Sequence, residues 1–155
     1  MKKIVAAICV IIICLCAITG CMKKSLPELP TEAVEFNMGT FHDREHDDAL
    51  FGSIEYLGRT YIVYGTINNK FRWNYVDSCI GYIIQNANSS SVIDPDNTNR
   101  RIYTLSEDSE HNFLMEFDDS IKVMNQPNFY RAIDTNGNKI DIPSYIDPLG
   151  YEFWE

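Results

Sequence analysis

Residues 53–67, SIEYLGRTYIVYGTI, contain two runs that are rich in β-branched and aromatic side chains. Such side chains are enriched in β-strands because they pack well on a pleated surface. Gly58 and Arg59 separate the two runs and fit a tight turn. The stretch therefore predicts a β-hairpin, with strands over 53–57 and 60–67.

Strand patterns continue after this hairpin, at intervals marked by Gly, Asn, Asp and Pro. Residues 129–133 and 139–142 predict a second hairpin, because Asn136-Gly137 between them supplies the positive φ angles of a primed turn. The polar stretch 86–101 is predicted to be a loop. Further strands are predicted at 79–84, 101–105, 112–117 and 121–124.

Helical patterns are scarce in this sequence. The best candidate covers residues 44–50, and one turn of helix is predicted around 74–78. Short strands punctuated by turn residues are typical of small sandwiches and barrels. We therefore predict a mainly β fold, a small antiparallel sandwich or barrel of about seven or eight short strands. A strand-rich α+β domain is the alternative.

The N-terminal segment differs from the rest of the chain. A short cationic start, Met1-Lys2-Lys3, precedes a run of 14 uncharged and mostly apolar residues, Ile4 to Ala17. A membrane-spanning helix needs about 20 apolar residues, whereas the apolar region of an export signal needs about 7–15. The segment therefore predicts a signal peptide over residues 1–20.

This signal ends in Ile18-Thr19-Gly20-Cys21, which resembles the bacterial lipobox. The resemblance implies that the Cys21 sulfur carries a diacylglycerol and that the bond between Gly20 and Cys21 is cut. Several acyl chains on one cysteine make a lasting anchor, which a single chain does not. The resemblance thus implies a protein held on the exported side of a cell membrane or outer membrane. An ordinary cleaved signal with an incidental cysteine is the alternative.

After the signal, residues 21–40 are predicted to be a lipidated cysteine and a flexible tether, and 41–155 a single β-rich globular domain. This organisation resembles that of small, mostly uncharacterised bacterial lipoproteins. The segments 80–83, 101–105 and 112–114 are similar to a strand pattern that recurs among them. The resemblance implies a fold type and no activity.

The charge balance limits the possible partners. The chain has 13 Lys and Arg against 22 Asp and Glu, and removal of residues 1–20 with Lys2 and Lys3 changes its formal charge from −9 to −11. Nucleic-acid binding rests on cationic side chains that neutralise phosphates. No nucleic-acid partner is therefore predicted.

Candidate chemical groups are few. Cys79, the one cysteine after Cys21, lies in an apolar strand pattern and is predicted to be a buried, inert thiol. His42, Glu45 and His46 match the H-x-x-E-H pattern of a class of zinc proteases, which needs an apolar-backed helix and a further ligand. We interpret the segment as solvated and acidic, with His42 and His46 as weak metal-ligand candidates. Neither a catalytic site nor a cofactor is predicted.

Aromatic residues are the remaining unusual feature, with eight Phe, nine Tyr and two Trp. Phe71, Trp73 and Tyr75 occupy alternate positions, so on a strand their rings would share one face. Trp154 belongs to a second aromatic group at the C-terminus. Rings with a polar edge are typical of binding surfaces, which makes these four residues ligand-binding candidates. Filling the ends of a small barrel is the alternative role.

Together these features predict a non-enzymatic binding domain, anchored to the membrane through Cys21, for a protein partner or an envelope polymer. The alternative is an immunity or inhibitor protein that protects the envelope from a secreted toxin or hydrolase. A formal charge of −11 after processing favours that alternative, because it would steer a basic target toward the domain.

Overall fold

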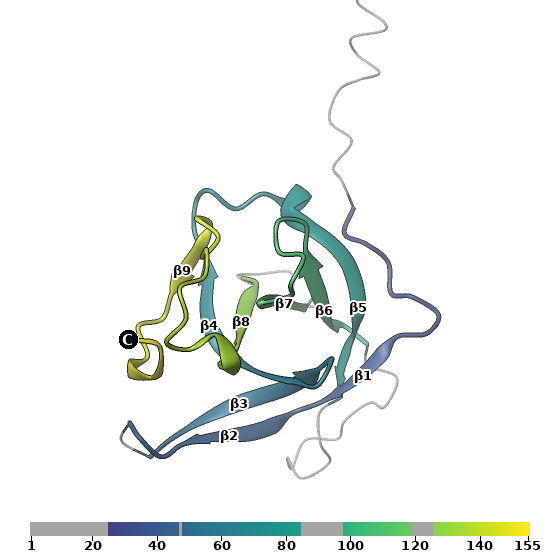
Figure 1. Cartoon of the computed structure of the whole chain (residues 1–155). Coiled ribbons are helices and arrows are strands. Elements are labelled where there is room, and N and C mark those ends of the chain that lie inside the picture. Colours follow the sequence, from purple (N-terminus) through teal and green to yellow (C-terminus); the bar gives the residue numbers. More distant parts are fainter. Residues whose placement is uncertain (1–24, 47, 85–97, 119–125) are drawn as a thin grey trace, which may run out of the picture.

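The structure is a computed structural model that describes residues 25–46, 48–84, 98–118 and 126–155 (Figure 1). The predicted signal peptide, Cys21 and the strand predicted at 121–124 lie outside these described residues, as does most of the predicted loop 86–101. In the described ranges, no helix is long and apolar enough to cross a membrane.

Strands dominate the described chain, which confirms the predicted mainly β fold. They are accompanied by short 3₁₀ turns, namely η1 (Trp73–Tyr75), η2 (Ile133–Thr135) and η3 (Glu152–Trp154). The strands are β1 (Val34–Asn37), β2 (Gly39–Asp43), β3 (Ala49–Tyr56), β4 (Arg59–Ile67), β5 (Val76–Ile84), β6 (Arg100–Leu105), β7 (Phe113–Asp118), β8 (Asn128–Ala132) and β9 (Ile146–Pro148).

The strands form one mixed sheet in the order β1-β5-β6-β7-β8-β4-β3-β2, and β9 pairs with β4. Neighbouring strands are antiparallel except for β1 and β5, which are parallel. The sheet curls into a half-barrel (Figure 1). The predicted barrel is therefore confirmed in outline, with one parallel pair added to its antiparallel sheet.

The two ends of the sheet are successive pieces of chain. β1 and β2 are separated only by Met38, yet β1 pairs with β5 whereas β2 pairs with β3. In Figure 1 the two strands continue one another along one side of the curl. Residues 34–43 thus act as one bent strand that links both margins of the sheet.

This arrangement corrects the prediction of a flexible tether over 21–40. β1 and the beginning of β2 lie within that range, and Phe36 is buried in the core. Leu26 and Leu29, further toward the N-terminus, pack against the core as well. The strand was missed because Phe36 is the one buried side chain of β1, so its sequence lacks a visible alternation.

The hairpin predicted from residues 53–67 is confirmed as β3 and β4, with Tyr56 paired to Arg59. Its turn is formed by Leu57 and Gly58, with φ angles of 50° and 74°, and not by the predicted Gly58 and Arg59, because Arg59 already belongs to β4. Positive φ at both central positions is what a primed turn requires, and its twist matches that of the flanking strands. Glycine supplies one of the two positive φ angles without steric cost.

The second predicted hairpin, over 129–142, is wrong. β8 matches its first arm, but the chain then enters η2, and residues 139–142 form no strand. Both edges of β8 are already paired, with β7 and with β4, so a returning arm has no edge to join. The chain instead forms β9. This strand pairs with residues 65–67 of β4, a part of β4 that β3 does not reach, because β3 pairs with residues 59–62.

The predicted helix over 44–50 is also wrong. Residues 44–46 and Asp48 lie in the turn between β2 and β3, and β3 already begins at Ala49. The helical turn predicted around 74–78 is present only as η1, because β5 begins at Val76.

Both faces of the sheet are covered by buried side chains. Along β7, Phe113 and Met115 belong to one cluster and Leu114 to the other, as strand alternation requires. Cys79 is buried in the first cluster, as predicted, and its Sγ lies 3.7 Å from the Gly81 carbonyl oxygen. The second cluster joins β1 to the strands around the curl and contains Phe36, Ile54, Tyr61, Ile83, Ile102, Leu114, Tyr130 and Ala132.

A first prediction concerns the close approach of β1 to β5 at Gly81. A Cβ at this position would collide with the Val34 carbonyl oxygen and lie 2.9 Å from the Phe36 ring. We expect Gly81→Ala to lower the free energy of unfolding by about 1–3 kcal/mol in urea denaturation, because overpacking displaces β1. Gly52→Ala is the matched control, since its Cβ meets only the movable terminal methyl of Met38. Equal losses in both variants would contradict this assignment.

Candidate binding surface at the β2–β3 hairpin and the C-terminus

The C-terminal segment is held against the β2–β3 hairpin by its connection to β4. β9 pairs with β4, and the Leu149 N–H then donates to the Tyr64 carbonyl oxygen at 2.9 Å. Gly150 turns the chain with a φ of 70°, which glycine adopts readily. The chain then enters η3, where the Trp154 N–H donates to the Tyr151 carbonyl oxygen at 3.0 Å.

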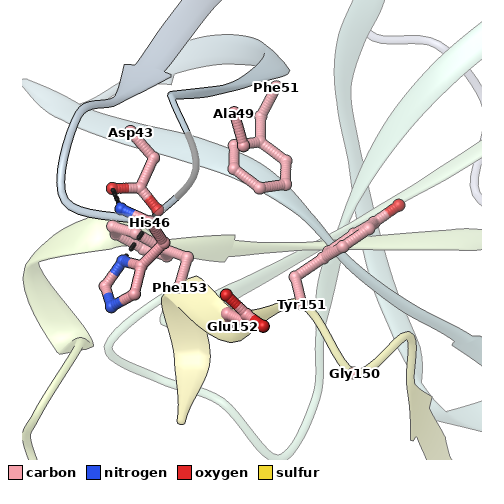
Figure 2. Close-up of a pocket in the computed structure, with 8 residues that line it drawn as sticks. All are labelled: Asp43, His46, Ala49, Phe51, Gly150, Tyr151, Glu152 and Phe153. Atoms are coloured by element: carbon pink, nitrogen blue, oxygen red, sulfur yellow. Dashed lines mark hydrogen bonds and ion pairs between the residues drawn. The ribbon is translucent and has the colours of Figure 1, made fainter.

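Aromatic rings from these two distant parts of the chain meet (Figure 2). Phe41 and Phe51 are register partners on β2 and β3. The Phe51 ring lies edge-on to Tyr151, with centroids 5.1 Å apart, and 6.4 Å from the Phe153 ring. Phe41 meets Phe153 at 5.2 Å. We call Phe41, Phe51, Tyr151 and Phe153 the aromatic surface; all four remain partly or largely exposed.

A pocket of about 240 Å³ opens within this surface. Pockets for drug-sized molecules usually measure about 300–1,000 Å³. The smaller volume suits one side chain or a similarly small group. The residues that line the pocket are Asp43, His46, Ala49, Phe51, Gly150, Tyr151, Glu152 and Phe153 (Figure 2).

Asp43 organises the hairpin side of the pocket. Its carboxylate is buried and accepts hydrogen bonds from the backbone N–H groups of Glu45, at 3.0 Å, and His46, at 3.2 Å. Its other oxygen lies 2.9 Å from the His46 Nδ1. Burial raises the pKa of Asp43, but these hydrogen bonds outweigh burial and hold the pKa below its usual value. The same bonds form a turn in place of the helix expected here.

Glu152 supplies a free negative charge at the C-terminal side. Its side chain is exposed and lies between Tyr151 and Phe153 in Figure 2. Among the described residues it has no ion-pair partner. A second hollow of about 300 Å³ adjoins the pocket across Phe153 and is lined by Phe41, His42, Asp43, Arg44, Glu45 and Phe153. The aromatic surface therefore has a mainly acidic rim.

Trp154 was a predicted ligand-binding residue, and the structure gives it a packing role. Its ring lies over the buried Arg131 guanidinium, 4.4 Å from its carbon atom, and edge-on to Tyr64 at 5.5 Å. Burial lowers the pKa of Arg131, and no carboxylate pairs with it in the described ranges. The cation–π contact therefore attaches the C-terminus to the sheet.

Phe71, Trp73 and Tyr75 lie close together, but in a loop and the 3₁₀ turn η1 and not on one face of a strand, and mainly within the core. Phe71 is buried and meets Trp73 at 5.1 Å and Tyr75 at 6.5 Å. Tyr75 stacks on Tyr145 at 4.4 Å. Trp73 alone among the three is exposed, at 40%. No ring contact joins Trp154 to this group in the described part of the chain.

His42 and His46, the weak metal-ligand candidates, have separate carboxylate partners. The His42 Nε2 lies 2.5 Å from Asp48, whereas His46 pairs with Asp43. Across the described ranges, no three His, Cys, Asp or Glu side chains converge on a possible metal position. The pattern of His42, Glu45 and His46 also loses its structural basis, because His42 lies in strand β2 and Glu45 and His46 in the turn after it, and none of them on a helix.

Sequence analysis overlooked Phe41 and Phe51. They lie ten positions apart and become neighbours only through the β2–β3 register, which the expected helix over 44–50 concealed. Tyr151 and Phe153 belong to the C-terminal aromatic group, of which the sequence points only to Trp154 as a ligand-binding candidate. Recognition of 39–43 and 49–56 as a hairpin would have revealed the pair.

Comparison with protein-family models, with curated proteins and with solved structures finds no match for the chain. Arguments about function therefore rest on the surface itself.

A second prediction tests the charge of Asp43. The pKa of Asp43 is lower in the folded state than in the unfolded state, where it is about 3.9. The charged carboxylate therefore stabilises the fold fully above the unfolded-state pKa. This stabilisation is lost as the pH falls through the lower folded-state pKa. Asp43→Asn should therefore lower the urea midpoint at pH 7, with a difference from wild type that shrinks near pH 3. Asp48→Asn, an exposed carboxylate of the same turn, is the control. A difference that grows toward pH 3 would contradict this role.

Proposed function

We propose that this protein is an exported, lipid-anchored and non-enzymatic domain that binds a protein partner through its aromatic surface. One observation carries the proposal: four partly exposed rings from two distant segments meet at the surface, and three of them line a pocket with an acidic rim. Exposed aromatic groups beside polar residues are typical of protein-binding surfaces. They do not contribute to a core, and they expose apolar area to water that a partner would bury.

The anchor is proposed on the sequence, from the lipobox-like residues 18–21 and the apolar run before them. It would hold the domain on the exported side of a cell membrane or outer membrane. The domain itself begins close behind Cys21, because Leu26 and Leu29 already pack against the core. Only a short stretch of chain would therefore separate the proposed anchor from the domain that carries the binding surface.

An immunity or inhibitor role is the second candidate, and a separate acidic surface favours it. Glu107, Asp108, Glu110 and Asp141 line a hollow of about 310 Å³ together with one cation, Lys139. With a formal charge of −11 after removal of residues 1–20, such a surface would attract a basic toxin or hydrolase. Inhibition of a captured hydrolase would distinguish this role from simple binding.

A third prediction tests the aromatic surface by removing one exposed ring. We expect Tyr151→Ala to abolish recovery of a specific envelope or secreted protein after cross-linking in cells and quantitative mass spectrometry. Trp73→Ala is the matched control, because Trp73 is similarly exposed, at 40% against 36% for Tyr151, but lies at the other predicted aromatic face. Equal recovery of the partner with the wild type, Tyr151→Ala and Trp73→Ala would overturn the proposal. Loss of the partner with Trp73→Ala alone would overturn it as well.

A fourth prediction tests the anchor at Cys21. Cys21→Ser removes the sulfur that the lipobox-like sequence predicts to be acylated. We expect this variant to lose metabolic labelling by an alkyne fatty acid and to leave the detergent phase in Triton X-114 partitioning. Cys16→Ser, within the apolar run, should retain both properties. Labelling that persists in Cys21→Ser would contradict the anchor.

A further inference from the structure

We propose that the pocket between Phe51, Tyr151 and Phe153 receives the cationic side chain of a lysine or arginine from a protein partner. This inference rests on the proposed binding function and specifies the chemistry of its ligand. It follows from three properties of the pocket, namely its aromatic walls, its charge and its size.

The walls present several aromatic rings to one small volume. Phe51 contacts Tyr151 at 5.1 Å with planes inclined by 69°, and Phe153 at 6.4 Å with planes inclined by 51°. Rings inclined to one another in this way cannot all stack on a flat ligand. They can surround a compact group, and the negative face of each ring attracts a cation within about 6 Å.

The charges of the pocket select a cation over a neutral apolar group. Asp43 and Glu152 line the pocket, and no Lys or Arg side chain does. Asp43 is held in its charged form by hydrogen bonds, and its depressed pKa follows from them. Glu152 has no ion pair among the residues described and is free to receive a cation. Arg44 lines only the neighbouring hollow.

The titratable groups around the pocket include His46, whose ring lies 6.5 Å from that of Phe153. Its Nδ1 is engaged by Asp43, so the His46 ring is held on the Asp43 side of the pocket, apart from the Glu152 carboxylate (Figure 2). A volume of about 240 Å³ is enough for one extended side chain. A basic side chain projecting from a partner meets these requirements.

The test is an NMR titration of the protein as the cell produces it, purified in a non-ionic detergent. The probes are the Nα-acetyl methylamides of lysine and arginine, with that of norleucine as the neutral counterpart. We expect both cationic probes to bind in the millimolar range, at least about tenfold more tightly than norleucine. The shifts should concentrate on the amides of residues 49–51 and 150–153.

Matched variants separate charge from ring contacts. Glu152→Gln should weaken the binding of the lysine probe by about two- to fivefold, and Tyr151→Leu should weaken it to a similar extent. Glu107→Gln, which removes an exposed carboxylate from the separate acidic hollow, should leave binding unchanged. The norleucine probe should respond to Tyr151→Leu but not to Glu152→Gln.

Three outcomes would overturn the inference: equal or tighter binding of norleucine, shifts that map to residues 107–110, or no saturable shift with any probe. These outcomes are distinguishable from failure of the proposed function. If Tyr151→Ala still loses the cross-linked partner while the cationic probes do not bind, the surface binds protein without a cation pocket. If the probes bind and no partner is recovered, only the proposed function fails.

Discussion

The fold depends on one bent strand that is hydrogen-bonded at both ends of the sheet. Residues 34–43 pair in parallel with β5 and then, after Met38, antiparallel with β3. Phe36 inserts from this strand into the cluster that contains Ile54 of β3 and Ile83 of β5. Because Phe41 and Asp43 lie on its continuation, the same strand fixes the hairpin side of the pocket. Curvature of the sheet and geometry of the surface therefore have a common origin.

Elements that are specified by residues close together in the sequence could be predicted, and elements that depend on distant partners could not. The β3–β4 hairpin is specified by strand propensity and by Gly58 in its turn, and both are visible within residues 53–67. β1 and β9 are short, with one buried residue each, and owe their existence to partners far along the chain. Asn136-Gly137 is a good turn signal, but pairing of both edges of β8 prevents a hairpin.

The candidate site was harder to predict for a related reason. Phe71, Trp73 and Tyr75 do lie close together, but in a loop and η1 and not on the strand that their alternate spacing suggests, and Phe71 is buried. The rings of the aromatic surface come from β2, β3 and the C-terminus, so their meeting depends on strand register. Trp154 contributes indirectly: by packing on Arg131 it restrains Phe153 beside it, so the ring is held in place before any ligand arrives.

The packing of Leu26 against the core limits how far the domain can extend from Cys21. Only four residues separate Leu26 from Cys21, and a fully extended chain spans at most about 3.6 Å per residue. With the proposed anchor in a bilayer, the five steps from Cys21 to Leu26 would keep Leu26 within about 18 Å of Cys21 and the domain next to the lipid surface. A molecule so confined searches in two dimensions and samples a thin layer of the envelope. Its natural partners would then be membrane-bound proteins, or proteins that approach the lipid surface closely.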